Sequence, residues 1–224
     1  KIGISNMLKI NTIILTAMSL LLVNTVNANN ITDDISYLQS EWAIINYETT
    51  EGEREDAFDA LSQKAKKIVE KYPNHAEPLV WEGIILSTYA GAKGGLGALG
   101  LIEEARDRLL EAEKINPNAL KGSIYTSLGS LYYQAPGWPI SFGSNDDAKL
   151  YLNRALELNP DGIDPNYFYG DFLIEQGKYK EALTVLQHAL EAPSRQKRPI
   201  ADTGRKVDIN KKIALAKKKI GQQQ

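Results

Sequence analysis

The sequence predicts an all-α protein, a solenoid of about four helical hairpins closed by a C-terminal capping helix. Three observations predict this fold. One skeleton of Ala, a large apolar residue four positions on, Ala three further on and a closing Pro recurs three times between residues 105 and 193. No segment alternates apolar and polar residues as a half-buried strand does. Beyond the last copy, one apolar stripe with lysines opposite runs to the C-terminus.

The recurring skeleton predicts the second helix of each hairpin. Its copies are EEARDRLLEAEKINP, DDAKLYLNRALELNP and KEALTVLQHALEAP, from Ala105 to Pro117, Ala148 to Pro160 and Ala182 to Pro193. Apolar residues spaced at i, i+4 and i+7 occupy one face of a helix, and small Ala residues let another helix come close. The Asn-Pro that closes the first two copies disfavours further helix, so each unit ends there.

The sequence before each copy of the skeleton predicts another helix, which is the first helix of the hairpin. One begins SIYTSLGSLYYQ, with Leu128-Gly129 and Tyr132 three positions on, and another carries Gly170, Gly177 and Tyr179. Together with the closing Pro, this pattern resembles the tetratricopeptide repeat. The predicted single domain covers residues 29–224, with hairpins at 31–73, 77–117, 120–160 and 165–193. A capping helix at 203–220 covers the face that a terminal repeat leaves bare.

The N-terminal segment predicts export. Lys1 and Lys9 flank a polar start, and an apolar run from Ile13 to Val23 follows. Val26-Asn27-Ala28 then places small or short residues at positions −3 and −1 of a signal-peptidase cleavage site. We expect residues 1–28 to be a signal peptide and the protein to be periplasmic or secreted after cleavage. The alternative is an uncleaved anchor, for which the apolar run is short. The absence of cysteine excludes disulfides and thiolate chemistry.

Two segments between helices are longer than a three-residue hairpin turn. These are AGAKGGLGALGL, residues 90–101, and QAPGWPISFGSN, residues 134–145. Insertions in the same turn of successive hairpins emerge on one edge of a solenoid, where binding loops often lie. Two interpretations remain for the second segment. Trp138 folds back on Tyr132 as a plug, or Trp138 and Phe142 line the mouth of an apolar ligand pocket. Ser144 is predicted to cap the following helix, with Asp147 completing a capping box.

The candidate binding residues lie on the first helices and in the basic C-terminal segment. Residues 195–220 hold ten Lys or Arg against Asp202 and Asp208. Arg198 and Arg205 could hold an anion or an acidic partner, or this segment only balances the acidic helices beside it. A groove for a partner is predicted from the aromatic residues of the first helices: Tyr125, Tyr132, Tyr167 and Phe168.

Catalysis, cofactors and metals are not expected. His75 and His188 fall in different units without a second ligand at metal spacing, and no Ser stands in a nucleophile-elbow context. Gly95-x-Gly97-x-x-Gly100 has dinucleotide-site spacing but no preceding strand, so no cofactor is predicted. DGIDPN at 161–166 lacks the later Glu of a calcium loop. Net acidity and predicted export disfavour nucleic acid as a partner.

A closer resemblance adds a functional expectation. The stretch from APGWPISFGSN to KYKEAL, followed by RPIADTGRK, resembles the T-component family of tripartite ATP-independent periplasmic (TRAP) transporters over roughly residues 75–210. The resemblance implies a periplasmic scaffold that contacts the substrate-binding subunit, self-associates and offers apolar clefts. The chain lacks the lipid-bearing Cys common in that family. The expected function is a non-catalytic scaffold that binds a protein partner. The alternative is a small apolar-ligand carrier with a pocket closed by the two inserted loops.

Overall fold

The computed structural model describes residues 31–222. The predicted signal peptide therefore lies outside the described residues. The chain divides into two compact units, Lys1–Tyr37 and Leu38–Gln224. The described part of the first unit, residues 31–37, is helical, and this helix ends at residue 47.

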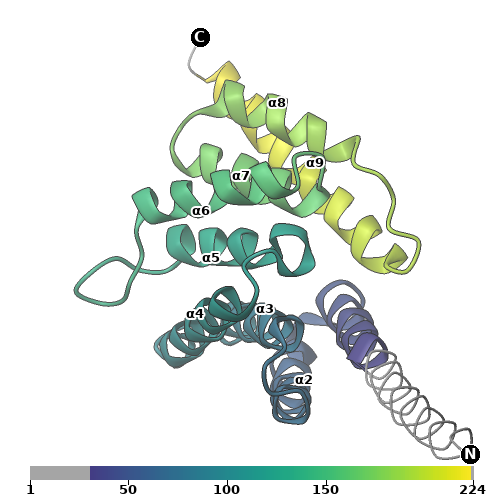
Figure 1. Cartoon of the computed structure of the whole chain (residues 1–224). Helices are drawn as coiled ribbons and strands as arrows, with labels where there is room; N and C mark the ends of the chain where they lie inside the picture. Colours follow the sequence, from purple (N-terminus) through teal and green to yellow (C-terminus); the bar gives the residue numbers. More distant parts are fainter. Residues whose placement is uncertain (1–30, 223–224) are drawn as a thin grey trace, which may run out of the picture. The chain divides into compact units, whose positions relative to one another are not determined.

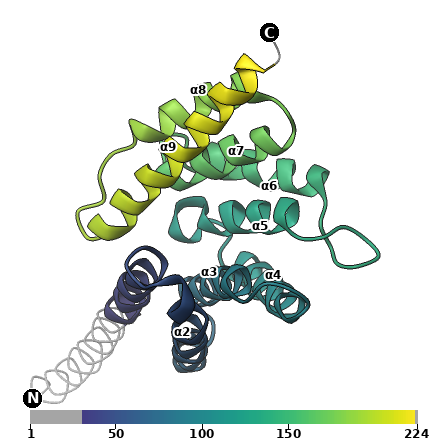
Figure 2. The ribbon, with the colours of Figure 1, turned by 180° about the vertical axis from the view of Figure 1, so that it is seen from behind.

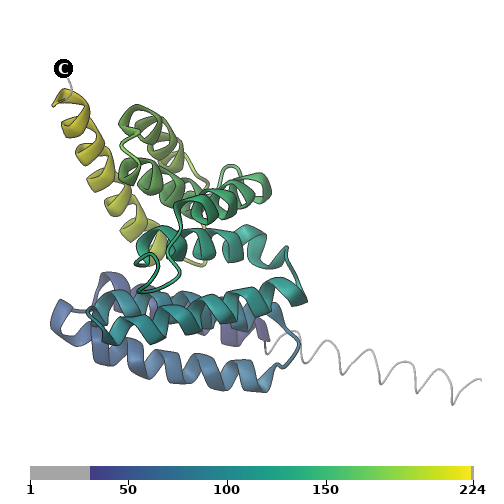
Figure 3. The same ribbon diagram turned by 90° about the vertical axis from the view of Figure 1, so that its left-hand side faces the viewer.

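The second unit is built of antiparallel helical hairpins in chain order (Figures 1 and 2). After residue 47 the helices are α2 (Glu51–Lys71), α3 (Ala76–Lys93), α4 (Gly97–Ile115), the 3₁₀ turn η1 (Ala119–Gly122), α5 (Ser123–Gln134), α6 (Asn145–Leu158), α7 (Ile163–Glu175), α8 (Tyr179–Leu190) and α9 (Pro199–Gly221). Helix α3 packs on α4, α5 on α6, and α7 on α8, while α9 packs on α8 and α7. Figure 3 shows α9, in yellow, along the side of this last hairpin.

This arrangement confirms the predicted all-α, tetratricopeptide-type hairpin solenoid with a C-terminal capping helix. Within residues 31–222 there is no strand, apart from an isolated bridge between Gly137 and Gly143. No helix in this part of the chain is both long and apolar enough to span a membrane. The cap is held by Ile209, Ile213 and Ala216, which join the core of the last hairpin.

The same close contact joins the two helices of three hairpins. A glycine of the first helix faces a leucine of the second, in the pairs Gly83–Leu109, Gly129–Leu152 and Gly170–Leu186. A Cβ placed on any of these glycines lies 2.6–2.7 Å from the Cγ of the leucine opposite. The three leucines are fully buried, as are the six alanines of the skeleton. Small residues thus set how closely each pair of helices packs.

The prediction of a long glycine-rich loop at residues 90–101 is wrong. Helix α3 continues to Lys93 and α4 begins at Gly97, so the turn holds only three residues, Gly94 to Leu96. Gly94 and Gly95 adopt φ values of +65° and +60°, which reverse the chain in this short space. The other glycines of the segment lie within the helices, where packing of the hairpin outweighs their low helix propensity.

The predicted start of the capping helix also differs. Helix α9 begins at Pro199 rather than at residue 203, because Pro at the first helical position lacks an N–H that a helix start would leave unpaired. Neither Asp202 nor Thr203 caps it. Asp202 lies in the first turn and accepts a hydrogen bond from the backbone N–H of Arg195 at 2.7 Å.

The segment between α5 and α6 is the one long insertion among the hairpin turns that the structure describes, and it projects from the hairpin (Figure 1). Ser144 accepts the N–H of Asp147 at 3.2 Å, as predicted for the cap of α6. The predicted capping box is not formed, because the N–H of Ser144 donates to the carbonyl of Tyr132 at 2.9 Å and not to Asp147. Phe142 folds back, with its ring 5.2 Å from Tyr132 and 4.5 Å from the guanidinium of Arg106. Trp138 does not fold back, since 89% of its surface is exposed. The plug interpretation of Trp138 is therefore wrong.

Replacing Gly129 tests the close contact between paired helices. We expect Gly129→Ala to lower the free energy of unfolding by about 2 kcal/mol, because the new methyl group overpacks Leu152. Gly100→Ala is the matched control, since a Cβ there meets nothing within 4 Å and Ala favours the helix by about 1 kcal/mol. Urea unfolding followed by circular dichroism measures both. Equal effects of the two substitutions would show that the close contact does not limit the packing.

Candidate functional site

The face of each first helix turned away from its partner helix lines a groove. On α5 this face consists of small hydroxyl residues at helical spacing: Ser123, Thr126, Ser127 and Ser130. On α3 it carries Trp81, Ile84 and Thr88, and on α7 it carries Pro165 and Phe168. Trp42, from the helix that ends at residue 47, completes the wall. The groove therefore crosses the first helices of four successive hairpins, and it is lined by their side chains at i, i+3, i+4 and i+7.

Two adjoining cavities make up this groove. The turn-side cavity, of about 580 Å³, reaches Gly95 in the α3–α4 turn and Pro136 after α5. The arginine-side cavity, of about 400 Å³, reaches η1 and the segment before α9. Residues that line both cavities join them: Trp42, Ser87, Thr88, Ser130, Phe168 and Arg205. The two turns predicted to be neighbours do meet in the turn-side cavity, although the first is far shorter than expected.

The hydroxyl groups of the groove are mostly committed within their own helices. Thr126 donates to the carbonyl of Gly122 at 3.2 Å, and Ser130 donates to the carbonyl of Ser127 at 2.9 Å. Thr88 donates to Ile84 and accepts the indole N–H of Trp42 at 2.9 Å. These bonds use the hydroxyl protons, so the hydroxyl groups present mainly acceptor lone pairs to the groove. Their side chains are small and leave the groove open.

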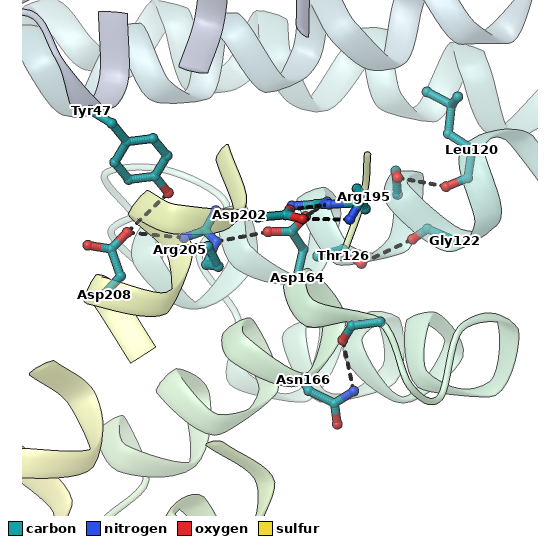
Figure 4. Close-up of polar contacts among 12 residues, drawn as sticks. Tyr47, Leu120, Gly122, Thr126, Asp164, Asn166, Arg195, Asp202, Arg205 and Asp208 are labelled. Carbon is teal, nitrogen blue, oxygen red and sulfur yellow. Dashed lines mark hydrogen bonds and ion pairs between the residues drawn. The ribbon is translucent and has the colours of Figure 1, made fainter. Parts of the chain in front are cut away.

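An ion-pair cluster closes one end of the groove (Figure 4). The carboxylate of Asp164, at the start of α7, accepts from Arg195 Nη1 at 2.6 Å and from Arg205 Nε at 2.8 Å. Asp202 accepts from Arg195 Nε at 2.6 Å. Asp208 lies 3.6 Å from Arg205 and accepts the hydroxyl proton of Tyr47 at 3.2 Å. The cluster ties α9 and the segment before it to α7 and to the end of the first described helix.

Burial and charge act in opposite directions on these groups. Burial alone raises the pKa of Asp164, but Arg205 and Arg195 outweigh it and hold that pKa well below its usual range. Burial lowers the pKa of Arg205, and Asp164 more than reverses the effect, so the net shift is upward. Burial raises the pKa of Tyr47, so this hydroxyl stays protonated and donates to Asp208. Asp164 and Arg205 are therefore both charged near neutral pH.

Three of the predicted binding residues meet at this groove. Phe168, Arg198 and Arg205 all line the arginine-side cavity. Arg205 stacks on both rings of the Tyr167–Phe168 pair, at 4.3 Å and 4.9 Å from their centroids. The charges of Arg205 and Arg195 are already paired, so they are not free for a ligand, whereas Arg198 makes no ion pair with the described residues.

The other predicted residues do not line the groove. Tyr125 and Tyr132 stack on Tyr151 of α6, with ring centroids 6.2 Å and 5.4 Å apart, because they lie on the face of α5 that meets its partner helix. Tyr167 is buried in the core of the last hairpin. Trp138 and Phe142 line neither cavity, so the prediction of a pocket closed by the two inserted loops is wrong.

Sequence reasoning missed the residues that do form the walls. Trp42 and Trp81 pack edge to face at 6.2 Å, across two hairpins, and both line the arginine-side cavity. The available signal was the period of 3.6 in the small hydroxyl residues of α5, on the face opposite Gly129. The sequence pattern places Asp164 only in an incomplete calcium loop. Residues 31–222 contain no group of three or more side chains arranged to hold a metal ion.

The stacked hairpins, the glycine–leucine contacts and the groove on the first helices together define a helical-repeat protein. A tetratricopeptide-repeat family model matches residues 140–198, which cover α6, α7, α8 and the segment before α9. No curated protein matches the sequence significantly. The family match therefore assigns the repeat to this part of the chain and not a function to the whole.

Two solved structures show weak similarity. One is TTC0263, a thermophilic tetratricopeptide-repeat protein of Thermus thermophilus, with 18% identity and a TM-score of 0.41 over 72% of this chain and 91% of that one. The other is MamA, with 19% identity and a TM-score of 0.43 over 75% of this chain and 91% of that one. The hairpin packing and the matched family model, not these two structures, define the repeat.

Removing the central carboxylate of the cluster tests its contribution to stability. We expect Asp164→Asn to lower the free energy of unfolding at pH 7 by about 3 kcal/mol, because two arginines lose their shared partner. The folded-state pKa of Asp164 is depressed, so its contribution is present above the unfolded value and falls as the pH drops below about 4. The difference from the parent protein should shrink by about 0.7 kcal/mol at pH 3.5.

Asp161→Asn is the control for this experiment, because Asp161 lies in the same turn but is 72% exposed and contacts only His188. Urea unfolding at pH 7 and pH 3.5 compares the three proteins. A loss at Asp161 as large as at Asp164, or a difference independent of pH, would contradict a stabilising charge cluster.

Proposed function

We propose that this chain is an exported, non-catalytic scaffold that binds a segment of a protein partner in the groove of its first helices. The observation that carries the proposal is the continuity of the groove, whose two cavities share six residues drawn from four hairpins and α9. Repeat folds of the tetratricopeptide type generally serve as protein-interaction scaffolds, and stacking of hairpins creates such extended surfaces. The N-terminal sequence supports export, which would place the partner in the periplasm or outside the cell.

The substrate-binding subunit of a TRAP-type transporter is the partner we propose. The loop that carries the resemblance to the T-component family exposes two apolar side chains, Trp138 at 89% and Ile140 at 62%. Pro136 and Pro139 stiffen this loop, so ordering it on a partner costs little entropy. An exposed Trp on a rigid loop is typical of residues that dominate protein–protein binding energy.

Two substitutions separate the groove from the loop. We expect Ser130→Arg, which fills the junction of the two cavities, to weaken binding at least tenfold by excluding the partner's segment. Trp138→Ala should weaken binding by about 2 kcal/mol, the loss typical of a central aromatic residue. Isothermal titration calorimetry with the purified substrate-binding subunit from the same organism measures both.

Lys149→Ala, an exposed position on α6, controls for general effects of substitution. No binding by the parent protein would reject this partner, and binding unaffected by Ser130→Arg would reject the groove as its site. Sedimentation of the same variants tests self-association: loss of an oligomer in Trp138→Ala alone would assign the loop to contacts between copies of this chain.

A further inference from the structure

The arginine-side cavity has the dimensions and lining of a small-molecule site. Its volume of about 400 Å³ lies within the range of such pockets, about 300–1,000 Å³. Trp42, Trp81 and Phe168 supply flat apolar surface, and the segment before α9 supplies cationic groups, with Arg198 over the ring of Trp81. The lining also includes the carboxylates of Asp161 and Asp164, of which Asp164 is already paired with Arg195 and Arg205. Apolar surface beside fixed polar groups is the usual form of a ligand site in a folded protein.

Arg198 and Lys121 line this cavity without a carboxylate bonded to them among the described residues, and Arg198 is the one that lies over an aromatic ring. Arg195 pairs with Asp164 and Asp202, and Arg205 pairs with Asp164 and Asp208. The side chain of Arg198 makes no hydrogen bond or ion pair with residues 31–222, and it lies over the ring of Trp81, 5.2 Å from the centroid. Asp164 and Asp202 act on its charge electrostatically without being bonded to it. Burial, followed by repulsion from Arg195, lowers the pKa of Arg198, which remains charged because a guanidinium group keeps its proton in proteins.

Two buried nitrogen atoms at this wall have no hydrogen-bond partner in the described part of the chain. They are Nε of Arg198 and the indole Nε1 of Trp81, which belong to stacked side chains. A buried donor without an acceptor has lost its hydrogen bonds to water with nothing in exchange, and the loss is larger when the group is charged. Both groups are hydrogen-bond donors, so a ligand that pairs with them must carry an acceptor atom. The positive charge of Arg198 favours an acceptor that is anionic.

The turn that faces this wall is strained. Leu120 and Lys121 adopt φ values of +49° and +50° in η1, and both line the cavity. Left-handed backbone is sterically unfavourable at a non-glycine residue, and Gly122 follows with φ of +83°. Such strain concentrates at ligand sites, where the surrounding structure holds a side chain in place. Lys121 adds a second cation to the lining, without an ion pair among the described residues.

The charge and the hydrogen-bonding groups select one kind of anion. A carboxylate carries one negative charge and two acceptor oxygens, which match a single buried guanidinium. A phosphate carries up to two charges and more acceptors, and it requires more free donors than the groove hydroxyls leave available. The aromatic walls favour an apolar or flat body beside the carboxylate.

We propose that the arginine-side cavity binds a small organic acid, with its carboxylate on Arg198 and its apolar body against Trp81 and Phe168. This site goes beyond the proposed function, because a small acid occupies the cavity whether or not a protein partner binds the rest of the groove. Since the cavity and the turn-side cavity share walls, bound acid and bound partner are coupled.

The indole N–H signals of the three tryptophans provide the test. The probe is 3-phenylpropionate, titrated into the ¹⁵N-labelled protein, and 3-phenylpropanamide is its neutral control of the same shape. We expect the acid to shift the Trp81 signal strongly, since its donor gains an acceptor, and to leave the signal of exposed Trp138 unchanged. For a probe of this size we expect a dissociation constant near or below about 1 mM.

Arg198→Gln should weaken binding of the acid at least tenfold and leave the weak binding of the amide unchanged. Arg154→Gln on α6 is the matched control, because Arg154 is exposed, pairs with Glu157 and lies over the ring of Tyr125, but does not line the cavity. Unchanged thermal unfolding of Arg198→Gln shows that the cavity is intact. If that variant is destabilised instead, Lys121→Gln and the dependence of binding on salt test the same charge requirement.

Any of three results would overturn the proposal. They are a shift of Trp81 by the amide as large as that by the acid, equal binding of the acid by Arg198→Gln and the parent protein, and a shift of Trp138 alone. Binding of the partner protein without any effect of the acid on Trp81 would also reject the small-acid site, while leaving the proposed scaffold function in place. Failure of partner binding with a clear Arg198-dependent shift would reject the scaffold function alone.

Discussion

Close contact between a glycine and a leucine inside each hairpin determines what the rest of the molecule can do. Gly83, Gly129 and Gly170 let the second helix approach so closely that its leucine fills the space where a side chain of the first helix would lie. The leucine and the two alanines beside it are then fully buried. With one face of the first helix used in this way, its opposite face is left for the groove.

The repeated contact explains why the fold was predictable and the groove was not. Ala105, Leu109 and Ala112, like their counterparts, recur at fixed spacing because all three are fully buried against the first helix. The leucine fills the space opposite a glycine, and the alanines leave room for the helices to approach. Groove residues obey no such rule. Ser130 and Phe168 line the same cavities from neighbouring hairpins, although one is small and polar and the other is large and apolar. The groove wall therefore repeats in position and not in residue type.

Aromatic side chains misled the prediction for a related reason. Tyr125 and Tyr132 recur on α5 as a groove wall would, but they stack on Tyr151 of the partner helix. Aromatic residues at helical spacing show that one face of the helix is distinct. Whether that face meets the partner helix or lines the groove follows only from the position of the glycine on the same helix. The side of α5 opposite Gly129 carries hydroxyl residues, and Thr126 and Ser130 bind their own backbone there. Read together, glycine and hydroxyl positions would have identified the groove.

Two arginines of the basic C-terminal segment act inside the protein. Arg195 and Arg205 pair with Asp164, Asp202 and Asp208, so their charges stabilise the joint between α7 and α9 and are not free to attract an anionic partner. This pairing also gives Arg198 its significance. In a segment where each neighbouring arginine has a carboxylate, one cation left against an aromatic wall is a selective feature rather than a general positive surface. A ligand that meets it must bring its own negative charge into a cavity where water competes poorly, and that requirement excludes neutral molecules more sharply than shape alone.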